Sequence, residues 1–91
     1  MKPQPLSMDS RPAIAPLYRL QFEAAQDAWV LLYPEGMVRL NGSAGEVLRR
    51  CDGRCSVHEL VAGLERDFDA AGVRTEAVQF LCDAHDRGWI V

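Results

Sequence analysis

The pattern of apolar positions changes abruptly near residue 17. From Tyr18 to Phe22 apolar and polar residues alternate, which predicts a strand with one buried face. Residues 28–33 are apolar throughout and predict a second strand. Its buried face is one of two sets: Val30 with Leu32, or Trp29 with Leu31 and Tyr33. After a Pro34-Glu35-Gly36 turn, residues 37–40 predict a short third strand.

Two segments with helical spacing follow the strands. The first opens at Asn41 or Ser43, both good helix caps, and stops at Asp52-Gly53. The second opens at Ser56 and Glu59, which are spaced as a capping box, and Gly72 ends it. The apolar stripe of this second helix consists of Val57, Leu60, Val61, Leu64 and Phe68.

A third helix is expected from Arg74 or Thr75 to Arg87, with Gly88 after its last turn. One side of it carries Ala77, Val78, Leu81, Cys82 and His85. Residues 89–91 form an apolar tail that we expect to fold back onto the body.

The order of elements predicts an α+β, winged-helix-like fold, in which a three-stranded antiparallel sheet is followed by three helices. We expect this domain to span residues 17–91. Four of the five prolines fall within the first sixteen residues. Because proline removes a backbone donor and restricts the residue before it, residues 1–16 are predicted to form a flexible N-terminal arm.

Composition narrows the classes of function. The chain has 91 residues, of which 48% are hydrophobic and 25% charged, which suits one small domain. A net charge of −3 argues against a partner held by its phosphates. There is no apolar run of about 18 residues, as a membrane span would require. We expect a cytoplasmic protein whose three cysteines are reduced.

Cysteine and histidine recur at spacings that zinc sites use. Cys51, Cys55 and His58 form one run, and Cys82 with His85 forms a second. However, Cys51 and Cys82 lie on apolar helix stripes, where a free cysteine acts as a small hydrophobe. We therefore expect no bound metal. The chain also lacks a glycine-framed nucleophile, a phosphate loop and a dinucleotide fingerprint, so we expect neither catalysis nor a cofactor.

A DNA-binding regulator is the alternative that a winged-helix fold suggests. Charge disfavours it. Residues 56–69 carry four carboxylates against one arginine, and residues 74–87 carry three against two. The basic cluster Arg49, Arg50 and Arg54 also has a simpler role, because cations stabilise the C-terminus of a helix.

One block of sequence is more specific than these patterns. The run Leu31 to Asn41, with Tyr33-Pro34-Glu35-Gly36-Met37-Val38-Arg39-Leu40-Asn41 at its centre, resembles the PqqD family of pyrroloquinoline quinone biosynthesis. The resemblance continues through Arg11-Pro12, Pro16-Leu17, Arg19-Leu20, Ala44, Val47-Leu48, Cys51-Asp52-Gly53, Val57-x-Glu59-Leu60 and Gly88-Trp89.

This resemblance implies a peptide chaperone without chemistry of its own. Members of the family are expected to bind the leader of the precursor peptide PqqA and deliver it to the radical S-adenosylmethionine enzyme PqqE. The peptide is expected to join the sheet as an added strand beside the third strand and to pack against the third helix.

Mapped onto this chain, the expected peptide-binding residues come from two elements. They are Met37, Val38, Arg39 and Leu40 of the third strand, and Ala77, Val78, Leu81, Cys82 and His85 of the third helix. Part of the helix set must also pack against the second helix and belong to the core. The apolar second strand and the open sheet edge leave a homodimer as an open alternative.

Overall fold

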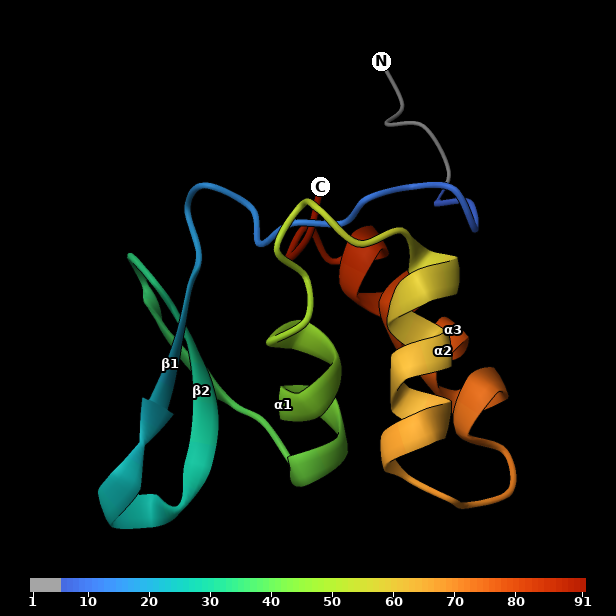
Figure 1. Ribbon diagram of the computed structural model, residues 1–91. Helices are drawn as coiled ribbons and strands as arrows, with labels where there is room; N and C mark the ends of the chain where they lie inside the picture. Colours follow the sequence, from blue (N-terminus) through green and yellow to red (C-terminus); the bar gives the residue numbers. More distant parts are fainter. Residues whose placement is uncertain (1–5) are drawn as a thin grey trace.

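The computed structural model describes residues 6–91 and confirms the expected α+β fold, a three-stranded antiparallel sheet followed by three helices (Figure 1). The elements are β1 (Arg19–Glu23), a 3₁₀ turn η1 (Ala24–Gln26), β2 (Ala28–Tyr33), β3 (Gly36–Arg39), α1 (Gly42–Leu48), α2 (Val57–Asp67) and α3 (Val73–Asp86).

The register of the sheet decides which face of β2 is buried against the helices. Leu31 lies opposite Leu20 of β1 and Val38 of β3, and all three contact the core. Because side chains alternate along a strand, Trp29 and Tyr33 share this face with Leu31. Val30 lies on the other face and is nevertheless 0% exposed.

The helices lie on one side of the sheet, with α1 next to it and α2 and α3 beyond (Figure 1). Figure 1 shows α1 between the sheet and the pair formed by α2 and α3, and α1 contacts both β2 and α3. Four fully buried side chains from different parts of the chain meet in this core: Leu31, Leu48, Leu81 and Ile90.

Helix α1 starts at the first of the two expected caps. The side chain of Asn41 accepts a hydrogen bond of 2.7 Å from the backbone N–H of Ala44, whereas Ser43 lies inside the helix. The helix ends at Leu48, before the expected stop at Asp52-Gly53, and a turn carries the chain on to Cys51.

Helix α2 has the capping box that was expected. Ser56 accepts from the N–H of Glu59, and Glu59 in return accepts from the N–H of Ser56. This second bond holds the pKa of Glu59 below its usual value. Because the pKa of this carboxyl is lower in the folded than in the unfolded protein, its ionised form stabilises the fold at pH values above the unfolded-state pKa. This stabilisation is lost as the pH falls through the folded-state pKa.

The C-terminus of α2 differs from the prediction. The helix ends at Asp67, and Phe68 has an extended backbone with φ of −126°. Phe68 therefore leaves the buried stripe and is 43% exposed. Gly72 has φ of 83° and serves as the N-cap of α3. The sequence predicted Phe68 on the stripe because the spacing of apolar residues does not show where a helix ends.

We predict that Ser56→Ala lowers the free energy of unfolding by about 1 kcal/mol, because it leaves an N–H donor of the first turn without its cap. Urea denaturation followed by circular dichroism measures the change. Ser43→Ala serves as the control, since Ser43 caps no helix, and a loss of the same size there would contradict the assignment.

Helix α3 ends as the sequence predicted. Gly88 has φ of 78° and donates to the carbonyl of His85 at 3.0 Å, while Trp89 donates to that of Ala84 at 2.9 Å. These two bonds form a Schellman motif, which turns the chain back on itself. As a result Ile90 is buried in the core, as expected of the apolar tail.

The N-terminal segment lies closer to the domain than the prediction of a flexible arm over residues 1–16 supposes. Pro12 is fully buried, and Ala13 exchanges two backbone hydrogen bonds with Val91. Further on, Ala15 donates to Trp89. Prolines remove donors but leave the carbonyls and the remaining N–H groups free to pair. Residues 1–5 lie outside the described part of the chain.

Candidate functional site

Strand β3 has one edge that is not paired. The sheet order is β1-β2-β3, and Leu40 donates to the carbonyl of Trp29 at 3.0 Å. In an antiparallel ladder, residues that hydrogen-bond to the neighbouring strand alternate with residues that do not. Val38, two residues before Leu40, therefore also directs its N–H and C=O toward β2. Met37 and Arg39 therefore point their backbone groups outward. The described residues provide no strand at that edge.

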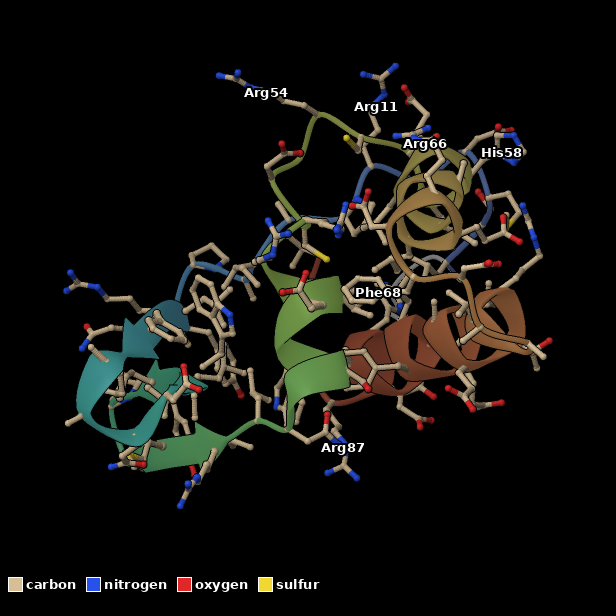
Figure 2. The ribbon with its side chains drawn as sticks, turned by 60° about the horizontal axis from the view of Figure 1, so that its bottom comes forward. Arg11, Arg54, His58, Arg66, Phe68 and Arg87 are labelled. Atoms are coloured by element: carbon tan, nitrogen blue, oxygen red, sulfur yellow. The ribbon has the colours of Figure 1, made fainter. Side chains whose placement is uncertain are left out.

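A cavity of about 600 Å³ begins where this edge ends. Asn41, two residues beyond Arg39, lies in its wall together with the N-terminal half of α1. The end of α2 and the first half of α3 close the other sides. Its apolar side chains are Ala44, Val47, Leu64, Phe68, Ala70, Val73, Ala77 and Phe80. Figure 2 shows Phe68 between α1 and the two longer helices. The volume is typical of a site that takes large apolar groups.

Two carboxylates line the cavity, and their surroundings differ. Glu46 lies 2.8 Å from Arg49 and 3.6 Å from Arg50, so its charge is balanced within the protein. Glu76 is exposed and forms no ion pair with any of residues 6–91. The cavity is thus apolar with one uncompensated negative charge at its rim.

The residues expected to bind from α3 occupy three different environments. Ala77 lines the cavity. Leu81 is fully buried in the core. Val78, Cys82 and His85 are half-buried and do not line the cavity. On β3, Met37 and Arg39 are exposed, Val38 is half-buried and Leu40 is buried. Of these expected residues, Ala77 alone lies in the cavity wall, which on the side of the sheet reaches Asn41, two residues beyond the end of β3.

The cavity side of α3 carries the expected Ala77 together with Val73 and Phe80, which were not predicted from the sequence. Their spacing of i, i+4 and i+7 is the signal of one helix face. It was overlooked because the helix was expected to begin at Arg74 or Thr75, which excluded Val73. Phe68 was missed for a related reason, since it was assigned to the core of α2.

Trp89 extends this side of α3 beyond the cavity. Its ring centre lies 6.5 Å from that of Phe80, and the guanidinium of Arg87 lies 5.5 Å above it. Phe80, Trp89 and Arg87 thus form a continuous row, from the apolar cavity to an exposed cation. Figure 2 shows Arg87 at the lower edge of the molecule, on the same side as the green strand that leads into α1.

The cysteines are unpaired and differ in exposure. Cys51 is buried and its thiol faces the carbonyl of Val47 at 3.5 Å. Burial, with a smaller contribution from the charge of Asp52, raises the pKa of Cys51 to about 12. Cys55 and Cys82 are half-buried. Within residues 6–91, no three side chains of the metal-binding types form a group that could hold a metal ion.

We predict that iodoacetamide at pH 8 modifies Cys55 and Cys82 of the folded protein at least tenfold faster than Cys51, because the thiolate is the reactive form and Cys51 stays protonated. Peptide mass spectrometry after timed quenching measures the rates. If all three cysteines react at equal rates in urea, the difference in the native protein is due to the fold. Rapid modification of Cys51 in the native protein would contradict the prediction.

Across the described residues, none of the helices has the length and apolar character that a membrane crossing requires. The two longest are α2 and α3, with 11 and 14 residues.

Comparison with known proteins places this geometry in a family. Residues 28–90 match the family model of coenzyme PQQ synthesis protein D (PqqD). The PqqA binding protein of Pseudomonas paraeruginosa is 49% identical over 85 residues, covering 92% of each chain. That of Methylococcus capsulatus is 41% identical over 85 residues, covering 93% of this chain and 91% of the relative.

A solved structure agrees with this assignment. The solution structure of the PqqD part of Methylobacterium extorquens PqqCD is described as a stand-alone recognition element for ribosomally synthesised and post-translationally modified peptides. It matches with a TM-score of 0.76 and 27% identity, over 100% of this chain and 99% of the other. The resemblance first noted in residues 31–41 is confirmed, and the chain belongs to the PqqD family.

Proposed function

We propose that this protein binds the precursor peptide PqqA as a strand added to the free edge of β3, and presents it to the radical S-adenosylmethionine enzyme PqqE. The relatives named PqqA binding protein support the choice of peptide. Presentation to PqqE is the second part of the proposal, and its support is the role that the family resemblance implies.

The observation that carries the proposal is the continuity of an unpaired strand edge with an apolar cavity. The outward N–H and C=O groups of Met37 and Arg39 offer main-chain hydrogen bonds to an extended peptide. Two residues further on, the cavity beside Asn41 offers a place for an apolar side chain of the same peptide. An edge supplies affinity for any extended chain, and the cavity adds selectivity for its sequence.

Calorimetric titration with PqqA tests the binding step. We expect one peptide per chain, and amide shifts that concentrate at Met37, Arg39 and the cavity wall from Val73 to Phe80. Shifts confined to the outward face of α2, or no heat of binding, would contradict strand addition at β3.

The step with PqqE needs its own measurement. We expect sedimentation of PqqE, PqqA and this protein together to show a complex that contains all three. A duplex DNA titration at the same ionic strength tests the DNA-binding alternative, which the exposed carboxylates of α3 disfavour.

A further inference from the structure

Arg50 is the side chain that links the two helices on one side of the cavity. It follows the C-cap of α1, and its side chain is only 18% exposed. Its Nη2 atom lies 2.7 Å from a carboxylate oxygen of Asp67, the last residue of α2, and 3.6 Å from one of Glu46 on α1. One guanidinium therefore joins the end of α2 to α1.

The residues next to this bridge form part of the cavity wall. Glu46 and Val47 line the cavity from α1, whereas Leu64 and Phe68 line it from the end of α2. Leu64 lies about one turn before the carboxylate that the bridge uses, and Phe68 directly follows it. Arg50 is not part of the wall, so it acts on the cavity through the residues that it connects.

Other contacts between α1 and α2 fix their separation less firmly. Helix α1 packs more closely against β2 and α3 than against α2. Apolar contacts are non-directional, whereas a charge-assisted hydrogen bond fixes a geometry. Among the ion pairs of residues 6–91, only that of Arg50 with Asp67 joins α1 or its C-terminus to α2. Arg49 pairs with Glu46 within α1.

Helix α2 carries a glycine where the guanidinium crosses it. A Cβ atom on Gly63 would lie 3.3 Å from Nη1 of Arg50, which is closer than an ordinary contact. Glycine is a poor helix former, and Gly63 has no positive φ that would require it. The Nε of Arg50 is buried without a hydrogen-bond partner among the described residues, a cost that a loosely held side chain avoids by turning to water.

We propose that Arg50 is a positioning residue that sets the width of the cavity, and through it the size of the apolar side chain that the cavity accepts. The inference rests on the proposed function, in which the cavity takes one apolar side chain of PqqA. With the bridge in place, Leu64 and Phe68 are held at a fixed distance from Val47. Without it the end of α2 moves away, and the bound side chain loses contacts on that side.

Arg50 also has a purely structural role, because cations suit the C-terminus of a helix. Loss of that role destabilises the protein and weakens binding of every peptide by the same factor. The test must therefore compare ratios of affinities, which a change in stability alone leaves unchanged.

The experiment titrates PqqA, and PqqA peptides in which one apolar residue at a time is replaced by alanine, into the wild-type protein. The replacement that weakens binding most identifies the anchor in the cavity. The ratio of the affinities for PqqA and for this alanine peptide then measures the selectivity of the cavity. We expect Arg50→Met to lower this ratio about fivefold, and Arg50→Lys, which keeps a cation beside α2, to lower it no more than about twofold.

Asp67→Asn breaks the same bridge from the exposed side, because it removes the charge of the acceptor and leaves the guanidinium in place. We expect it to lower the ratio in the same direction as Arg50→Met. Since the side chain of Asp67 is 52% exposed, this variant provides the test even if Arg50→Met does not fold. Circular dichroism checks the fold of each variant.

Arg49→Met is the matched control. It makes the same substitution at the preceding residue and removes the 2.8 Å pair with Glu46, but leaves the link to α2 intact. The ratio should stay within about twofold of wild type. In the protein without peptide, nuclear Overhauser effects between the cavity-wall methyl groups of α1 and those of α2 should weaken in Arg50→Met and not in Arg49→Met.

The outcomes separate this inference from the proposed function. If wild-type protein has a clear anchor but Arg50→Met and Asp67→Asn keep its ratio, the positioning role is wrong and the proposed function stands. If PqqA binds and no alanine replacement weakens binding, the cavity holds no anchor, and the positioning role fails while strand addition stands. If wild-type protein does not bind PqqA, both fail.

Discussion

Gly45→Ala is expected to destabilise the protein by about 1–3 kcal/mol, although alanine is the better helix former by about 1 kcal/mol. A Cβ atom at position 45 would lie 2.5 Å from Cδ1 and 2.8 Å from Cγ of Trp29. The Cβ of Trp29 itself lies 3.0 Å from the added atom, so rotation of the indole, whose ring packs edge-on against Phe22 at a centre distance of 5.3 Å, cannot relieve the whole clash. Helix α1 would have to move away from the sheet.

Gly42→Ala is the matched control on the same helix. No atom lies within 4 Å of the Cβ that it would add, so we expect no loss of stability and a gain of up to about 1 kcal/mol. Thermal and urea denaturation of both variants measure the difference. Trp29→Leu in the Gly45→Ala background should recover part of the loss. Equal stability of the two alanine variants would show that α1 does not pack closely against Trp29.

Arg39→Pro is expected to weaken binding of PqqA about 10- to 100-fold and to leave the fold intact. The N–H of Arg39 points away from β2, and proline is tolerated where an edge strand directs its N–H outward. The peptide carbonyl that this N–H would meet loses its donor, at a cost of about 1–3 kcal/mol. The proline ring also obstructs the added strand.

Arg39→Ala separates the backbone from the side chain, since it removes the guanidinium and keeps the N–H. We expect it to bind PqqA within about threefold of wild type, as suits the loss of one exposed charge. Titration calorimetry gives the affinities, and amide spectra confirm that the sheet is preserved. Full affinity in a folded Arg39→Pro protein would exclude strand addition at this edge.

Local rules in the sequence determined most of the secondary structure. The alternation from Tyr18 to Phe22, the capping box at Ser56 and Glu59, and the glycine at position 88 each depend on residues within a few positions of one another. Their outcome could therefore be predicted without knowing the fold. The order of three strands and three helices, and hence the fold class, followed from these signals.

Only the tertiary structure decided which of the two apolar faces of β2 packs against α1. Both faces of β2 are apolar, and the side that meets α1 follows from the register with Leu20 and Val38 and from the close approach of Gly45 to Trp29. The stripe on α3 was likewise ambiguous. Val73, Ala77 and Phe80 turn to the cavity, whereas Val78, Cys82 and His85 lie outside its wall.

The physical reason is that burial depends on contacts between segments far apart in the chain. Phe68 has the spacing of a core residue of α2, yet the helix ends one residue before it, and its ring becomes part of a cavity that α1 and α3 complete. Pro12 lies in a segment whose composition is typical of a flexible arm, yet it is buried. Its neighbours Ala13 and Ala15 find hydrogen-bond partners in the backbone of the C-terminal tail. The sequence by itself determined the elements and the family, and the packing of distant segments made the site.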